Sequence, residues 1–187
     1  MSNNIFIFHG TRGSPEENWF PWLKAELEKS GCKVFTPRFP TPENQNLESW
    51  FEAFENYKKY INKNSIFIGH SIGCAFILDV LEQIDIKINT CFFVAGFLGL
   101  LNLEVDKLNK TISDKEFDWE KIKNNCNKFI LFQSDDDPYV SMGKAEELKE
   151  KLDGELIIIK GAGHFNAKAG YLKFEKLRDK VLEILQK

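Results

Sequence analysis

The sequence has no excess of positive charge. Lys and Arg total 25 against 28 for Asp and Glu, which gives a formal net charge of −3 at pH 7. Proteins that bind nucleic acid by neutralising its phosphates usually carry a basic excess, either globally or in one block. We therefore expect no nucleic-acid partner.

Long apolar runs are also missing. No run approaches the roughly 20 residues that a transmembrane helix requires. The first four residues lack the basic segment of a secretory signal, and the apolar run that follows, residues 5–8, is too short for the core of one. The sequence thus predicts a cytoplasmic protein that does not associate with a membrane.

Spacing patterns typical of metal and nucleotide sites do not occur. The four cysteines lie far apart, without a C-x-x-C pair or a neighbouring His, at Cys32, Cys74, Cys91 and Cys126. There is no G-x-x-x-x-G-K-[ST] sequence, and no predicted strand is followed by G-x-G-x-x-G. We expect reduced thiols, no metal and no cofactor.

Aromatic carbon, in contrast, is abundant. The 187 residues include 17 Phe, and each aromatic side chain removes ~150–250 Å² from water when it is buried. This length is that of one domain, and its aromatic content is enough for a sizeable core. We expect a single domain over residues 1–187.

Short apolar runs alternate with amphipathic stretches along the chain. The apolar runs are predicted strands at residues 5–8, 33–36, 65–68, 90–95, 128–132 and 155–159. The amphipathic stretches are predicted helices at residues 18–29, 47–61, 72–83, 143–152 and 172–185. Because the runs lack polar alternation, they suit a parallel sheet with helices on both faces. The fold class is therefore α/β, a three-layer sandwich.

One connection is longer than a single crossover helix needs. Residues 97–127 separate the fourth and fifth predicted strands. They form either a small cap over the sheet edge or a long crossover, and we favour the small cap.

The third predicted strand leads into Gly69-His70-Ser71-Ile72-Gly73, and a predicted helix follows. G-x-S-x-G at a strand–turn–helix junction is the context of a nucleophile elbow, in which a sharp turn raises the serine above the sheet. The start of the helix then offers free N–H groups to a developing oxyanion. The alternative is a loop serine that caps the helix.

A nucleophilic serine needs a base, and the chain has three histidines. His70 is adjacent to Ser71, so its side chain points elsewhere, and His9 follows the first strand. His164 follows the last strand in a glycine-rich loop, at the carboxyl edge where open α/β sheets bind ligands. We take His164 as the base; a loop histidine that bonds only locally is the alternative.

The acid that orients the base should lie between the serine and the histidine in the chain. Asp135, Asp136 and Asp137 follow the fifth predicted strand directly. Their mutual repulsion favours a function at this edge, although a solvated turn could account for two of them. Composition does not choose among the three.

An oxyanion hole requires two N–H donors. One comes from Ile72, the residue after the serine, and the other from the loop after the first strand. Gly10 lets the backbone turn there, so we expect the second donor at Thr11, with Gly10 as the alternative.

Together these residues resemble the small serine hydrolases typified by retinoblastoma-binding protein 9 and the bacterial YdeN proteins, compact members of the α/β-hydrolase superfamily. The resemblance covers nearly the whole chain. It is carried by His9-Gly10, Asn18-Trp19-Phe20-Pro21-Trp22-Leu23, the prolines at 37, 40 and 42 before Trp50, Gly69–Gly73, Ser134–Tyr139 and Gly163-His164-Phe165.

The resemblance implies a parallel sheet of order 2-1-3-4-5-6 without a large lid. In this family the catalytic aspartate precedes a short apolar pair, which implies Asp137. Ser141 stands where the family commonly has a proline, so Asp136 remains the alternative.

These residues lead to the hypothesis of a serine hydrolase that cleaves small carboxylic esters, or related thioesters or amides, through Ser71, Asp137 and His164. Phe20, Phe97 and Phe165 flank the loops of the site and either line an acyl pocket or belong to the core. The second hypothesis is a protein-binding module on a hydrolase scaffold with vestigial catalysis, since fold does not determine function.

Overall fold

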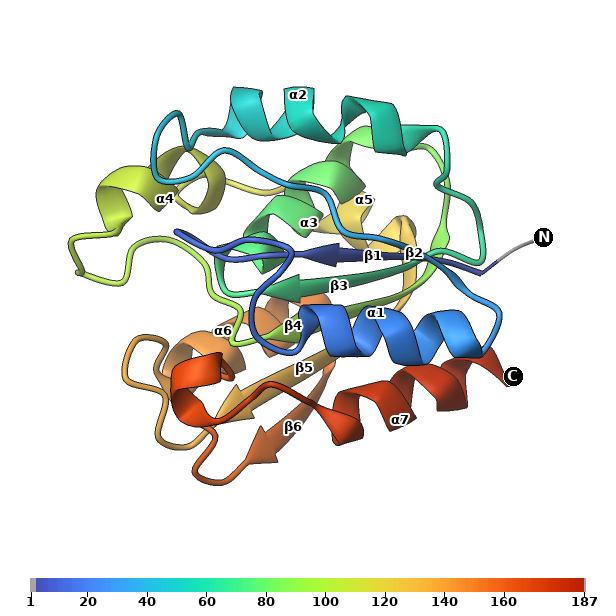
Figure 1. The fold of residues 1–187 in the computed structure, drawn as a ribbon. Helices are drawn as coiled ribbons and strands as arrows, with labels where there is room; N and C mark the ends of the chain where they lie inside the picture. The colour runs from blue at the N-terminus through green and yellow to red at the C-terminus, as the bar shows by residue number, and fades with distance from the viewer. Residues whose placement is uncertain (1–2, 187) are drawn as a thin grey trace.

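The computed structural model describes residues 3–186, and a six-stranded sheet runs through its centre (Figure 1). The strands are β1 (Asn4–Phe8), β2 (Lys33–Phe35), β3 (Ile66–His70), β4 (Ile88–Val94), β5 (Cys126–Ser134) and β6 (Glu155–Ile159). All neighbours are parallel, in the order β2-β1-β3-β4-β5-β6. The predicted fold class and strand order are confirmed.

Helices cover both faces of the sheet. They are α1 (Phe20–Lys29), α2 (Leu47–Lys58), α3 (Ile72–Gln83), α4 (Asp106–Ser113), α5 (Trp119–Asn124), α6 (Met142–Leu152) and α7 (Glu175–Leu185), with a 3₁₀ turn at Ala167–Ala169. The pair α1 and α7 lies on one face, whereas α2, α3, α5 and α6 lie on the other (Figure 1). This is the three-layer arrangement that connected parallel strands adopt.

Alternate side chains of β1 supply the two cores. Phe6 and Phe8 belong to the core under α2 and α3, while Ile5 and Ile7 belong to the core under α1 and α7. All four are almost fully buried. A strand that is apolar on both faces can therefore bury all of its side chains only in the middle of a sandwich.

The long connection of residues 97–127 forms two helices. The short α5 packs against α3 and α6 and returns the chain to β5. The other helix, α4, packs against α3 through Ile112 and lies near the carboxyl ends of β1 and β3 (Figure 1). Its position matters below, because the loops that carry the candidate site follow those strand ends.

None of the helices within residues 3–186 is both long and apolar enough to cross a membrane.

The turn from β3 into α3 is packed tightly against β1. A Cβ atom at Gly73 would lie 2.6 Å from the Phe8 carbonyl oxygen and 2.7 Å from that of His9. A Cβ at Gly69 would lie 2.8 Å from the Cys74 backbone nitrogen. Because these neighbours are backbone atoms, they cannot move aside cheaply, and both glycines are required by close approach.

We predict that Gly73→Ala lowers the free energy of unfolding by about 1–3 kcal/mol, since α3 must move away from β1. Urea denaturation measures the change.

Gly143→Ala is the matched control, because Gly143 is also the second residue of its helix, α6. A Cβ added at Gly143 would have the Ser141 Oγ as its nearest neighbour, at 3.9 Å, so alanine fits there. This variant should be neutral or up to about 1 kcal/mol more stable. Equal effects at the two positions would contradict the packing argument.

Candidate active site

Ser71 lies at the junction of β3 and α3 with a strained backbone. Its φ is 56° and its ψ −125°, a conformation that non-glycine residues rarely adopt. Its N–H donates to the Val94 carbonyl at 2.9 Å, and its own carbonyl accepts from the Cys74 N–H at 3.0 Å. These bonds hold the turn in place. The sequence predicted that the strand ends at residue 68, but β3 continues to His70, so the chain reverses abruptly at Ser71.

A cavity of about 500 Å³ opens beside Ser71. This volume is typical of small-molecule sites. Residues 10–13, 70–71, 164 and 166–168 line it, and an apolar wall is formed by Leu101, Leu103, Val105 and Tyr139. Within residues 3–186, no group of three His, Cys, Asp or Glu side chains is placed to hold a metal ion.

His164 enters the same cavity and is bonded to Asp137. Its Nδ1 donates to the Asp137 Oδ2 at 2.8 Å. The Asp137 side chain is fully buried, and its Oδ1 accepts the N–H groups of Tyr139 at 2.9 Å and Val140 at 3.1 Å. Three donors thus fix the carboxylate, and because Nδ1 carries the donated hydrogen, Nε2 is the ring nitrogen available to accept a proton.

The other two acidic residues of the cluster have different partners. Asp135 accepts the Gly161 N–H at 2.8 Å. Asp136 accepts the Ser134 hydroxyl at 2.6 Å and the Gly163 N–H at 2.7 Å, and these bonds lower the pKa of its carboxyl. The structure therefore brings Asp137, and neither Asp135 nor Asp136, to His164.

His70 is buried beneath His164 and supports its backbone. The His70 Nε2 donates to the His164 carbonyl at 2.8 Å. Burial beside Trp19 and Phe20 lowers the pKa of His70 to about 3, so this ring is neutral. Sequence analysis did not assign this contact, because 94 residues separate the two partners and no local pattern reports it.

The loop after β1 is held by a second neutral histidine. The Phe39 N–H donates to the His9 Nε2 at 3.0 Å, so the proton of the neutral ring is on Nδ1, which donates to the Gly10 carbonyl at 2.8 Å. Burial lowers the pKa of His9. The Gly10 carbonyl also accepts the Gly13 N–H at 3.1 Å.

This loop is in contact with the elbow. A Cβ at Gly10 would lie 3.1 Å from the Cβ of Ser71, and both Gly10 and Thr11 line the cavity. On the other side of Ser71, the N–H of Ile72 is in the first turn of α3, where no intrahelical acceptor is available. Of the three residues expected at an oxyanion hole, Ile72 follows Ser71 in the chain, Gly10 is in contact with it, and Thr11 lines the same cavity.

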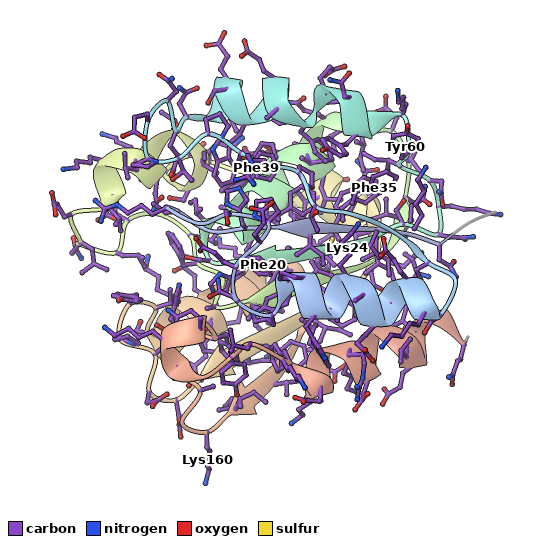
Figure 2. The ribbon with its side chains drawn as sticks, viewed as in Figure 1. Phe20, Lys24, Phe35, Phe39, Tyr60 and Lys160 are labelled. Atoms are coloured by element: carbon purple, nitrogen blue, oxygen red, sulfur yellow. The ribbon has the colours of Figure 1, made fainter. Side chains whose placement is uncertain are left out.

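The phenylalanines expected in an acyl pocket do not line the cavity. Phe20, Phe97 and Phe165 are almost fully buried and belong to the cores of the sandwich. Phe20, for example, lies at the start of α1 (Figure 2). Its ring packs against that of Trp19. The acyl-pocket prediction for these residues is thus corrected to core packing. The apolar wall comes mainly from residues 101–105, which the sequence analysis did not single out.

Comparison with known proteins gives consistent results. YdeN of Bacillus subtilis (strain 168) is 26% identical over 189 residues, which cover 100% of this chain and 98% of YdeN. The crystal structure of the ydeN gene product from B. subtilis matches with a TM-score of 0.93 over all of both chains. Serine hydrolase RBBP9 of Rattus norvegicus is 27% identical over 148 residues, 79% of this chain and 77% of that protein.

A more distant structure shares the fold alone. Est1E from Butyrivibrio proteoclasticus has a TM-score of 0.75 and 16% identity, over 100% of this chain and 89% of Est1E. The family model described as serine hydrolase matches residues 5–183, nearly the full length. The chain belongs to the serine hydrolase family.

Proposed function

We propose that this hydrolase cleaves small carboxylic esters with Ser71 as nucleophile, His164 as base and Asp137 as the orienting acid. The observation that carries the proposal is the 2.8 Å bond from His164 Nδ1 to a buried Asp137, in the cavity that Ser71 also lines. A base with a fixed tautomer in the same cavity as a serine on a strained turn is the arrangement that acyl transfer requires.

In the first half of the reaction, Ser71 Oγ attacks the ester carbonyl carbon while its proton passes to His164 Nε2. The carbonyl π electrons move to the oxygen, which becomes an oxyanion. When this tetrahedral intermediate collapses, the C–O bond to the alcohol breaks and the His164 imidazolium protonates the leaving oxygen. The acyl group stays on Ser71. Water then attacks the acyl-enzyme with His164 again as base, and the carboxylic acid and free serine are formed.

Two N–H groups would stabilise the oxyanion. That of Ile72 belongs to the first turn of α3, where donors are unpaired and the helix dipole is positive. The Thr11 N–H belongs to the same peptide group as the Gly10 carbonyl. This carbonyl accepts hydrogen bonds from His9 Nδ1 and from the Gly13 N–H. Because C=O and N–H point in opposite directions across a trans peptide, these bonds orient the Thr11 N–H away from them. Donors oriented before reaction need no rearrangement as charge develops.

The cavity supports a small substrate. Its volume of about 500 Å³ fits an ester of modest size, and its apolar wall of Leu101, Leu103 and Val105 suits a short acyl chain. Thioesters and amides present the same carbonyl group to Ser71, and their hydrolysis can be measured in the same assays.

We predict that a fluorophosphonate probe labels only Ser71, because only a serine next to a base is activated. Peptide mass mapping of the labelled protein identifies the residue. Ser71→Ala should abolish both labelling and ester hydrolysis, whereas Ser141→Ala, at another helix start, should keep both. Folded wild-type protein without any labelling would refute the proposal and favour a protein-binding role on this scaffold.

Among the acidic residues, Asp137→Asn should lower kcat by roughly three to four orders of magnitude, because an amide no longer stabilises the correct imidazole tautomer. Asp135→Asn is the matched control. Its amide oxygen can still accept the Gly161 N–H, so kcat should change by no more than a few fold. Steady-state kinetics on p-nitrophenyl butyrate measures both, and similar losses would mean that Asp137 is not the acid.

The neutral state of His70 also predicts a pH effect. The folded-state pKa is about 3 against an ordinary value of 6.5, so the unfolded chain takes up the proton first as pH falls. His70 therefore costs stability progressively below pH 6.5, at about 1.4 kcal/mol per pH unit, and has no effect above it.

His70→Gln removes this titration but keeps an N–H donor toward the His164 carbonyl. The free energy of unfolding, wild type minus variant, should fall by about 2–3 kcal/mol between pH 7 and pH 4.5 in urea titrations. Other titrating groups, such as Asp79, whose pKa burial raises to about 7, are common to both proteins and cancel. Parallel stability curves would show that His70 is not held neutral.

A further inference from the structure

A buried polar network joins the loop after β1 to helix α4. It consists of four side chains, Thr11, Thr41, Gln45 and Asn109. Gln45 is 7% exposed and Asn109 is 2% exposed, yet Asn109 also lines the cavity. The polar atoms of a buried carboxamide are normally hydrogen-bonded. The partners of each amide therefore show which of its atoms, the oxygen or the nitrogen, faces the cavity.

The orientation of the Gln45 amide is fixed from both ends. The Arg12 backbone N–H can only donate, and it donates to Thr41 Oγ1 at 2.7 Å. The Thr41 hydroxyl hydrogen is thereby free to donate to Gln45 Oε1 at 2.6 Å. At the other end, the Leu108 carbonyl can only accept, and it lies 3.3 Å from Gln45 Nε2. The Gln45 nitrogen therefore faces α4.

The orientation of Asn109 follows from that of Gln45. Gln45 Nε2 donates to Asn109 Oδ1 at 2.8 Å, and the Thr11 hydroxyl donates to the same oxygen. Asn109 Nδ2 is then the atom left over. Among residues 3–186 no acceptor is bonded to it. The network thus holds an amide with two unused N–H donors at the wall of the cavity.

The position of Asn109 indicates which part of a substrate it would contact. His164 protonates the leaving alcohol in the proposed reaction, so the alcohol lies on the side of the loops after β5 and β6. Helix α4 lies on the opposite side of the carboxyl end of β3 (Figure 1). The wall formed by Leu101, Leu103, Val105 and Asn109 is therefore next to the acyl chain.

We infer that Asn109 determines acyl specificity by donating a hydrogen bond from Nδ2 to an oxygen in the acyl chain, so that the preferred substrates are esters of short acids that carry an ether, keto or amide oxygen. This inference rests on the proposed hydrolase function. An unbranched alkyl chain packs against the same apolar wall but leaves the N–H groups of Asn109 without an acceptor. The unpaired donors cost binding free energy in the transition state.

The test compares three isosteric p-nitrophenyl esters on the wild-type enzyme: the pentanoate, the ethoxyacetate and the 3-methoxypropanoate. Each kcat/KM is divided by the hydroxide-catalysed rate constant of the same ester, which removes the inductive effect of the oxygen. At least one ether ester should exceed the pentanoate by about 3- to 10-fold, the value of one net hydrogen bond. Equal normalised values for all three would overturn the inference even if no variant folds.

Asn109→Asp isolates the donor. The carboxylate keeps an oxygen for Thr11 and Gln45 but presents an acceptor to the cavity in place of the N–H groups. The ratio of ether to alkyl ester should fall to about one or below. Asn18→Asp makes the same chemical change elsewhere on the cavity, where the side-chain oxygen accepts the Ala167 N–H at 2.8 Å, and it should keep the wild-type ratio.

The outcomes separate the two claims. An unchanged ratio in a folded, fluorophosphonate-reactive Asn109→Asp variant would overturn the role of Asn109 and leave the hydrolase proposal standing. An equal fall of the ratio in Asn18→Asp would show a general charge effect and also overturn it. Failure of the wild type to hydrolyse any of the three esters would overturn both proposals.

Discussion

Four consecutive residues, the last of β5 and the three that follow it, hold the loop of His164 against the edge of the sheet. Their side chains accept from, or are bonded to, four consecutive residues of that loop, in the pairs Ser134–Ala162, Asp135–Gly161, Asp136–Gly163 and Asp137–His164. Three adjacent carboxylates repel one another, but each here has its own donors, which compensates the repulsion. In the proposed reaction the rest of the site depends on this junction, because a base displaced by even 1 Å loses most of its effect.

Burial divides the histidines by role. His9 and His70 are almost completely enclosed, and desolvation lowers the pKa of both rings. Each acts as a fixed neutral donor to a backbone carbonyl, one under the loop after β1 and one under His164. His164 alone among the three enters the cavity while its Nδ1 is bonded to a carboxylate. In the proposed reaction, His164 is therefore the residue that takes the proton from Ser71.

The six strands and the helices α1, α2, α3, α6 and α7 could be predicted from the sequence. Inner strands such as β1 and β3 are buried on both faces, which leaves continuous apolar runs. The short α4 and α5 were not predicted, because they lie in a connection without a clear apolar period. The strand order came from resemblance to a family, since period and composition do not determine which strands are neighbours. Asp137 could not be separated from Asp136 by composition, because the difference lies in where the backbone directs two identical side chains. Phe20 was misassigned for a similar reason, since it is near the site in sequence but turns toward the core.

The two sides of the cavity are held together by different kinds of contact. On the side of Ser71, the contacts are between backbone atoms, as where α3 meets the carbonyls of Phe8 and His9. On the side of α4, the loop after β1 is joined through interchangeable side-chain amides and hydroxyls. Backbone packing tolerates almost no substitution, whereas amide and hydroxyl partners can be exchanged in pairs. Under the proposed function, evolution or design can therefore retune the acyl preference of this scaffold through residues 45 and 101–109 while its reaction chemistry stays constant.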